Sequence, residues 1–194
     1  PSSFGLQPGY AVSFEFYQRQ KEFYDLNLDE SLNGRDAPST GTVSQINVFI
    51  RFADDPEFSQ PRSYYDAVFQ TDNDEPSLKH YFWEVSYNNL LVNTYHYPGT
   101  LGGSNTAYVD QFNRSYYQPY SGANPDGYQD SNERTQREHT LLANAIDAIA
   151  PSVSPSLDID ANGDGLVDAV SFVIYGGTGD WADLLWPHRW ALYS

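Results

Sequence analysis

The feature that most constrains the fold is the order in which strand-like and helix-like patterns follow each other along the chain. Residues 46–52 and 169–175 are dense in β-branched and aromatic residues, which is typical of buried strands. The segments between them are predicted, in order, as a helix over 61–69, a helix over 77–86, a strand over 90–95 and a helix over 132–150. This alternation predicts an α/β (α+β) domain in which a mixed, twisted sheet packs against two to three helices.

The predicted helices carry start signals and apolar faces. Ser77 is placed to cap the helix that follows it. The apolar stripe of that helix consists of Leu78, Phe82 and Val85, at i, i+4 and i+7. The helix over 132–150 has Glu133 near its start, where the helix dipole favours an acidic residue. Its apolar face is formed by Leu141, Leu142, Ala145, Ile146 and Ile149.

A linker-like segment at residues 37–42 (Ala-Pro-Ser-Thr-Gly-Thr) divides the chain. We therefore expect an N-terminal segment over 1–37, either a propeptide remnant or a leading strand, and a larger unit over 38–194. The chain begins at Pro1 and contains no Met, so we expect a processed chain or an excised piece. The large residues before Ser194 lead to the expectation that the larger unit is incomplete at its C-terminal end.

Charge and composition exclude several classes of protein. With 26 acidic and 10 basic side chains, the formal net charge of −16 disfavours binding to nucleic acid phosphates. The chain has no Cys, and so no disulfide, thiol nucleophile or Cys-ligated metal. No apolar run is long enough to span a membrane. Residues 99–130, rich in Tyr, Gly and Asn, are predicted to form a long loop region. We expect a secreted protein from this composition.

The most specific motif is the carboxylate-rich loop before the last predicted strand. Asp160, Asn162 and Asp164 stand at positions 1, 3 and 5 of an EF-hand-type calcium loop, with a Gly at position 6. The backbone carbonyl of Leu166 is offered at position 7, and Asp168 stands at position 9. Alternate residues of a coiled loop direct such oxygens inward, and calcium takes six to eight of them. The sequence therefore predicts a bound Ca²⁺ with a structural role.

The match to an EF-hand ends at position 12, where Ser171 stands in place of the bidentate Glu. The next predicted element is also a strand and not a helix. We therefore expect a calcium loop of related geometry that takes a further ligand from elsewhere, with Asp158 as the nearest candidate. The alternative is a solvated turn, rich in Asp and Asn, that binds no metal.

The histidines identify no catalytic site. The chain contains no H-E-x-x-H sequence, so none of its four histidines belongs to a zinc-protease helix. Glu138 and His139 are expected to form a solvated or satisfied surface pair rather than a ligand set, and the same is expected of His80 on its helix. His188, which lies among tryptophans, either belongs to the core or faces a cleft, and the structural role is the favoured interpretation.

Three segments match, in order and spacing, those of one known family. They are residues 48–54 (Val-Phe-Ile-Arg-Phe-Ala-Asp), residues 77–87, of the form S-L-x-x-Y-F-x-E-V-S-Y, and the calcium-like loop with residues 170–176 and 186–190 (Trp-Pro-His-Arg-Trp) after it. Together these segments resemble secreted bacterial zinc metallopeptidases of the immune inhibitor A type. The resemblance runs from about residue 40 to the C-terminal end and covers the N-terminal part of that family's catalytic domain.

The resemblance implies a metalloendopeptidase, secreted with a propeptide, that acts on protein or peptide substrates through a zinc-activated water and a Glu base. In that family the H-E-x-x-H helix follows the Trp-Pro-His-Arg-Trp region. Zn²⁺ ligands and catalytic residues are therefore expected beyond Ser194, and this chain alone is expected to be inactive. No zinc ligand can be assigned to any residue of this sequence.

Two other classes of function remain open. One is a calcium-stabilised extracellular domain that binds carbohydrate or protein through its Tyr-rich loops and has no catalytic activity. The other is a protease-like domain that has lost its zinc site and serves adhesion. The tyrosines between Tyr108 and Tyr128 favour the first of these only if they are exposed, and packing within the loop is the simpler interpretation.

Overall fold

The computed structural model describes residues 37–71 and 76–177. The chain divides into two compact units, residues 1–36 and 37–194, and every described residue belongs to the second. The predicted N-terminal segment over 1–37 therefore lies outside the described residues, apart from Ala37. His188 and the Trp-Pro-His-Arg-Trp segment lie outside them as well.

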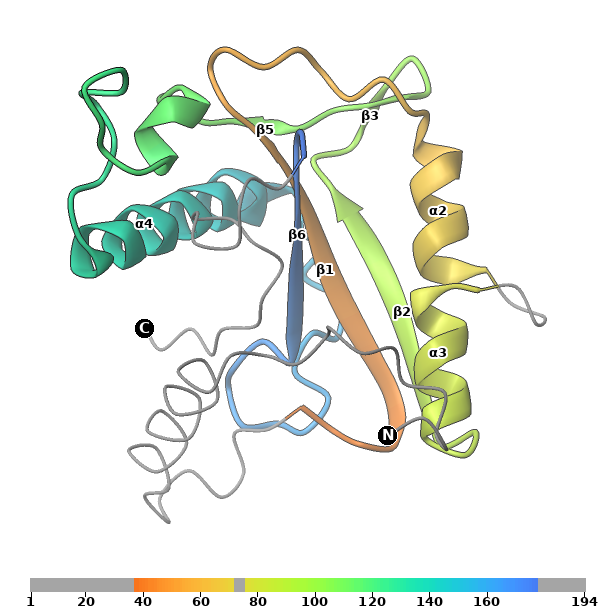
Figure 1. Cartoon of the computed structure of the whole chain (residues 1–194). Helices are drawn as coiled ribbons and strands as arrows, with labels where there is room; N and C mark the ends of the chain where they lie inside the picture. The colour runs from red at the N-terminus through yellow and green to blue at the C-terminus, as the bar shows by residue number, and fades with distance from the viewer. Residues whose placement is uncertain (1–36, 72–75, 178–194) are drawn as a thin grey trace, which may run out of the picture. The chain divides into compact units, whose positions relative to one another are not determined.

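A mostly parallel sheet forms the centre of the described unit (Figure 1). Its middle strand, β1 (Gly41–Arg51), pairs in parallel with β2 (Leu90–Tyr97) on one side and with β6 (Ala169–Ile174) on the other. The predicted strands at 46–52, 90–95 and 169–175 thus all form. The fold is mixed α/β, as the strand and helix patterns predict.

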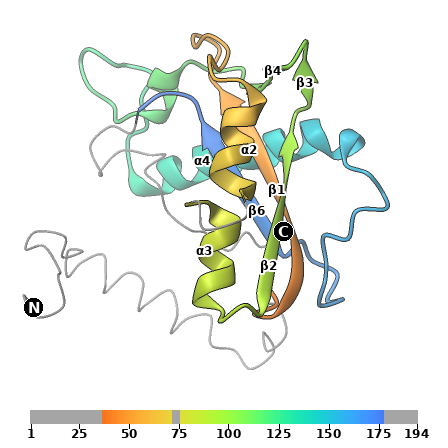
Figure 2. The same cartoon turned by 90° about the vertical axis from the view of Figure 1, so that its right-hand side faces the viewer.

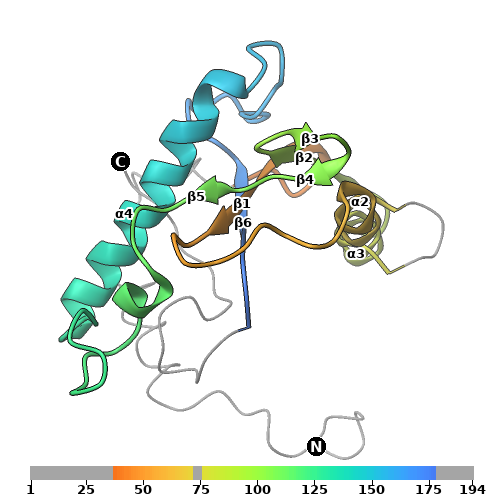
Figure 3. The same cartoon turned by 90° about the horizontal axis from the view of Figure 1, so that it is seen from above.

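Helices cover both faces of this sheet (Figures 2 and 3). α2 (Arg62–Gln70) and α3 (Leu78–Val85) lie on one face, and α4 (Ser131–Ile149) lies on the other. Parallel neighbours in a sheet require such crossover connections. Each helix begins and ends within one residue of its predicted bounds. None of the described helices is long and apolar enough to cross a membrane.

The helix starts follow from their capping residues. The Ser77 hydroxyl accepts a hydrogen bond from the backbone N–H of His80, as expected for an N-cap. The Asp130 carboxylate accepts from the first backbone N–H groups of α4, and Glu133 accepts in return from the N–H of Gln129. This pattern resembles a capping box, except that Glu133 accepts from the residue before the N-cap instead of from the N-cap itself. At the other end, the short 3₁₀ segment η4 (Ala150–Ser152) follows α4.

The main core lies between α4 and the sheet. Ile46, Val48 and Ile50 of β1 are buried there against Leu141, Leu142, Ala145 and Ile149 of α4, while Ile146 is partly buried. A smaller cluster on the other face joins Val43, Leu90 and Val92 to Leu78 and Phe82 of α3. The predicted apolar faces of α3 and α4 thus pack against the sheet, with one exception. The prediction for Val85 is wrong, because its side chain is 53% exposed at the end of α3.

The last strand is less buried than its apolar sequence indicates. Every residue of β6 is half-buried, whereas β1 is fully buried over most of its length. Within the described residues β6 has only β1 as a strand neighbour, so one of its edges is not covered by the sheet. The expectation of a buried strand at 169–175 is therefore too strong.

The predicted loop over 99–130 contains short pieces of regular structure. β3 (Thr100–Leu101) and β4 (Ser104–Asn105) form a small antiparallel hairpin. β5 (Tyr108–Val109) adds to the sheet by pairing in parallel with the end of β1. The 3₁₀ helix η3 (Arg114–Tyr117) then leads toward α4. This region lies against one end of α4 (Figure 1), and its Tyr117 and Tyr128 belong to the main core.

Candidate metal loop and buried histidine network

The predicted calcium loop connects η4 to the start of β6. Its first residue, Asp160, accepts backbone hydrogen bonds at both carboxylate oxygens: Oδ1 from the N–H of Asp164 at 2.9 Å and Oδ2 from the N–H of Gly165 at 2.8 Å. Gly163 and Gly165 have φ values of 74° and 86°, a left-handed conformation that favours glycine. The two glycines let the loop coil around the Asp160 carboxylate.

The oxygens at positions 1, 3 and 5 turn toward the inside of this coil. The side-chain oxygen of Asn162 and Oδ1 of Asp160 both accept from the N–H of Asp164, at 3.0 and 2.9 Å, so these two oxygens lie close together. Oδ1 of Asp164 accepts from the N–H of Leu166 at 2.8 Å, and its Oδ2 accepts from the Asn162 amide at 3.2 Å. The three side chains therefore follow one another along the inner side of the loop.

The remaining predicted ligands lie at the two ends of the loop. Asp168 closes it, because its Oδ2 accepts from the N–H of Ala161 at 2.7 Å and its own N–H donates to the carbonyl of Ile159. Asp158 lies just before the loop and accepts from the N–H of Asp160 at 3.2 Å. Except for Asp160 and Asp168, which are half-buried, the predicted ligand residues are exposed.

The predicted ligands suit a hard cation, but in the described ranges their carboxylates do not lie close enough together to form a metal-binding group by themselves. All six predicted ligands offer oxygen, and a carboxylate that accepts one N–H per oxygen keeps further lone pairs for a metal. In the described ranges, however, no three His, Cys, Asp or Glu side chains form a group that could hold a metal. The amide of Asn162 and the carbonyl of Leu166 would have to complete the ligand set.

The described histidines do not form a zinc site. His80 lies on α3 and pairs with Glu84 at 3.4 Å across one helical turn, as expected for a surface histidine. The expectation of a Glu138–His139 pair at the surface is wrong, because Glu138 is buried, at 5% exposure, on the side of α4 that packs on the core. The helical position of Glu138, three residues before Leu141, places it on that apolar face.

A buried hydrogen-bond chain on the α2/α3 face of the sheet is the feature that the sequence does not identify. The Gln45 amide donates to the Ser171 hydroxyl at 2.7 Å, and that hydroxyl donates to Oδ1 of Asn47, also at 2.7 Å. The amide nitrogen of Asn47 lies 2.9 Å from Nδ1 of His96. Since this amide nitrogen is a donor, Nδ1 accepts and the proton of neutral His96 resides on Nε2.

His96 ends this chain beneath α2. Its Nε2 lies 3.5 Å from Oδ1 of Asp66, and the rings of Phe49 and Phe69 pack within 5.5 Å of its own. Burial, with a further contribution from the nearby Arg62 guanidinium, lowers the pKa of His96 to about 4, against the opposing effect of Asp66. His96 is therefore neutral over the physiological pH range.

Alternating polar residues in the strands are the signal that would have revealed this network. Parallel strands with helices on both faces are usually continuously apolar. Gln45 and Asn47 alternate with Ile46 and Val48 in β1, so the middle of one face of that strand is polar although it is buried, with apolar Val43 and Phe49 on either side. The register pairs Asn47 with His96 on β2 and with Ser171 on β6, which explains why these residues meet.

Arg114 closes the carboxyl ends of β1 and β6, the place where open α/β sheets commonly bind ligands. Its guanidinium lies 4.9 Å from the centre of the Phe52 ring and 3.7 Å from Oδ2 of Asp55. A side chain at Gly176 would require the Arg114 side chain to shift. Arg114 thus contacts the residues that follow both strands, Asp55 after β1 and Gly177 after β6.

The segments that carry the family resemblance occupy defined places in the fold. Residues 48–54 form the end of β1 and the turn in which the Asp54 carboxylate accepts from the N–H of Arg114. Residues 77–87 form α3 with its cap, and residues 170–174 lie in β6. Comparison with models of protein families and with curated proteins finds no match to this chain.

Proposed function

We propose that residues 158–168 bind one structural Ca²⁺ ion and that the chain is part of the catalytic domain of a secreted zinc metalloendopeptidase. The calcium proposal is carried by the geometry of the loop, and the peptidase proposal by the three sequence segments that resemble the immune inhibitor A family. The two proposals are independent, and each has its own test.

The observation that supports calcium binding is the coiling of the loop around Asp160. Oxygens of Asp160, Asn162 and Asp164 follow its inner side, and the glycine conformations permit this path. In the proposed site, Asp158, Asp160, Asn162, Asp164 and Asp168 supply side-chain oxygens and Leu166 supplies its carbonyl. Ca²⁺ would neutralise part of the repulsion between these carboxylates and fix the connection from η4 to β6.

Isothermal titration of the chelator-treated 194-residue chain with CaCl₂ tests this site. We expect one ion per chain and a rise in melting temperature, because an ion that binds only the folded state stabilises it. Asp160→Asn and Asp164→Asn each remove one ligand charge and should weaken binding by about tenfold or more. Asp147→Asn, on the exposed side of α4, is the matched control and should leave binding unchanged. Absence of both heat and stabilisation would reject the calcium site.

The peptidase proposal rests on the resemblance and on the places that its segments take in the fold. Two of them lie in adjacent strands of the sheet, β1 and β6, and the third forms α3, which packs against β2. In the family, a zinc ion supplies an activated water for peptide hydrolysis. The described residues offer no fitting ligands for zinc, so their proposed contribution is the framework of the domain.

Proteolysis is tested with the complete product of the gene. We expect cleavage of casein that a zinc chelator abolishes and added Zn²⁺ restores, while the 194-residue chain by itself leaves casein intact. If the complete product shows no chelator-sensitive cleavage, the peptidase proposal is wrong. A retained calcium site would then favour a calcium-stabilised binding or adhesion domain.

A further inference from the structure

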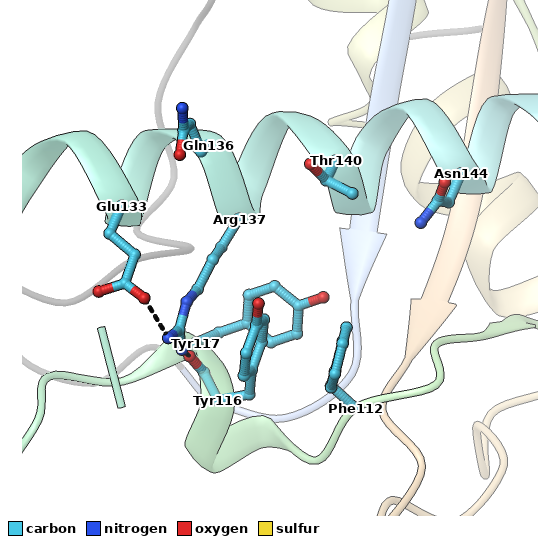
Figure 4. Close-up of a pocket in the computed structure, with 8 residues that line it drawn as sticks. All are labelled: Phe112, Tyr116, Tyr117, Glu133, Gln136, Arg137, Thr140 and Asn144. Atoms are coloured by element: carbon cyan, nitrogen blue, oxygen red, sulfur yellow. Dashed lines mark hydrogen bonds and ion pairs between the residues drawn. The ribbon is translucent and has the colours of Figure 1, made fainter. Parts of the chain in front are cut away.

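A pocket of about 230 Å³ lies between α4 and the loop that precedes it (Figure 4). Phe112, Tyr116 and Tyr117 form its aromatic wall. Its other wall is one side of α4, where Gln136, Thr140 and Asn144 recur every fourth residue and therefore lie in one row. None of the residues that line this pocket belongs to the proposed calcium loop.

The aromatic wall is held in place by contacts within the protein. The rings of Phe112 and Tyr116 are stacked, with centroids 4.0 Å apart and planes within 12°. The guanidinium of Arg137 covers the other side of the Tyr116 ring, 3.6 Å from its centre. Figure 4 shows Arg137, Tyr116 and Phe112 following one another along the direction of α4. The wall is thus preformed, which lowers the cost of binding a ligand.

The charged groups at the pocket are already paired. Arg137 donates to Glu133 at 2.5 Å and to the backbone carbonyls of Tyr116 and Asp126. The Tyr117 hydroxyl donates to the buried carboxylate of Asp110 at 2.8 Å, and burial together with this bond raises the pKa of Tyr117. Neither a full positive nor a full negative charge is therefore offered to a ligand.

Three neutral polar groups also face the pocket. Figure 4 shows the Tyr116 hydroxyl directed toward α4, and Thr140 and Asn144 on the helix above the rings. Figure 4 draws no hydrogen bond from these side chains, or from Gln136 nearby, to the other residues that line the pocket. Hydroxyl and amide groups each donate and accept, so they suit a ligand whose own groups do both.

We propose that this pocket binds a single neutral sugar ring. The hydroxyls of such a ring both donate and accept, which matches Tyr116, Thr140 and Asn144, and its C–H groups are apolar enough to pack on Phe112. The volume is smaller than the roughly 300–1,000 Å³ of pockets for drug-sized ligands, so it admits one ring rather than a longer molecule. With a net charge of −16, the chain disfavours anionic ligands.

Nuclear magnetic resonance of the ¹⁵N-labelled 194-residue chain tests the proposal with methyl glucoside, methyl galactoside and N-acetylglucosamine as probes. We expect at least one sugar to shift the side-chain amide signals of Asn144 and Gln136 in a saturable way, with weak affinity. Tyr116→Phe keeps the stacked ring but removes its hydroxyl, and should weaken binding by about fivefold. Thr140→Val, which keeps the side-chain shape, should have a similar effect.

Tyr120→Phe is the matched control, because Tyr120 is 53% exposed and does not line the pocket. It should leave the affinity unchanged. The proposal is overturned if none of the three sugars shifts the pocket signals, or if Tyr116→Phe and Thr140→Val both bind as tightly as the unmodified chain. Circular dichroism of each variant shows whether it is folded, and a loss of binding counts only for a folded variant.

Discussion

The two faces of the sheet are built in opposite ways from the same strands. Toward α4, β1 presents Ile46, Val48 and Ile50, which pack in an apolar core. Toward α2 and α3, the alternate residues Gln45 and Asn47 are equally buried, yet they take part in a hydrogen-bond chain. One strand thus separates an apolar face from a face on which buried polar contacts lie among apolar residues such as Val43 and Phe49.

The difference shows that a substitution at a buried position lowers stability in two distinct ways, depending on whether the side chain is apolar or polar. An apolar side chain can be shortened at the cost of a cavity, and its neighbours can partly relax. A buried polar group that loses its partner pays a desolvation penalty that relaxation does not remove. The apolar face should therefore respond to changes in volume, and the polar face to changes in hydrogen bonding and in pH.

The largest effect is expected on the apolar face. Leu141 of α4 is fully buried, so Leu141→Ala should leave a cavity and lower the free energy of unfolding by about 3 kcal/mol or more. Urea denaturation measures this change. Asp147→Ala, at an exposed position on the same helix, should alter the stability by less than about 0.5 kcal/mol.

On the polar face, Asn47→Leu keeps the volume nearly constant but removes the central member of the hydrogen-bond chain. We expect a loss of about 2–3 kcal/mol, because Nδ1 of His96 and the Ser171 hydroxyl are both left without this partner. If packing alone governed this face, the nearly isosteric change would be almost neutral. Adding His96→Leu to Asn47→Leu should recover part of the loss, since one stranded polar group is then removed.

The polar face should also make stability depend on pH. The pKa of His96 is about 4 in the folded chain and about 6.5 in an unfolded one. Protonation therefore favours the unfolded chain, and the stability present above pH 6.5 is lost as the pH falls toward 4. This group alone should cost about 2 kcal/mol at pH 5 relative to pH 8. His96→Gln should show less pH dependence between these values, and equal dependence would contradict the assignment.

The smallest effect is expected at Ser171, the member of the hydrogen-bond chain that lies on β6. Ser171→Ala removes one donor and one acceptor, but β6 is half-buried, so water can replace part of what is lost. We expect a destabilisation of about 1 kcal/mol in urea denaturation. A cost as large as that of Asn47→Leu would show that Ser171 is protected from water as fully as Asn47, contrary to the half-buried position of β6.

Much of the fold can be predicted from the sequence because its signals are local. Ser77 and Glu133 mark helix starts, and the β-branched runs mark strands, so three helices and three strands lie where expected. The exposure of Val85 and the partial burial of β6 could not be predicted, because each depends on which neighbours tertiary packing supplies. Periodicity identifies a face, but it does not show where that face ends.

The candidate sites differ in the same respect. The calcium loop is contiguous, so the spacing of Asp160, Asn162 and Asp164 is enough to propose it. The hydrogen-bond chain joins residues up to 126 positions apart in the sequence, such as Gln45 and Ser171, and only the strand register brings them together. The expected surface position of Glu138 is wrong because its place in the helix, three residues before Leu141, puts it on the buried face of α4.

The central place of β1 has a consequence for how the molecule opens. β2, β5 and β6 each hydrogen-bond to β1, and within the described residues they do not pair with one another. No outer strand can therefore stay attached when β1 is released, whereas β1 keeps its partners when a single outer strand frays. Amide protons of β1 should exchange with deuterated solvent last, and only through unfolding of the whole unit. The strand that separates the two faces of the sheet therefore also determines how long both faces stay folded.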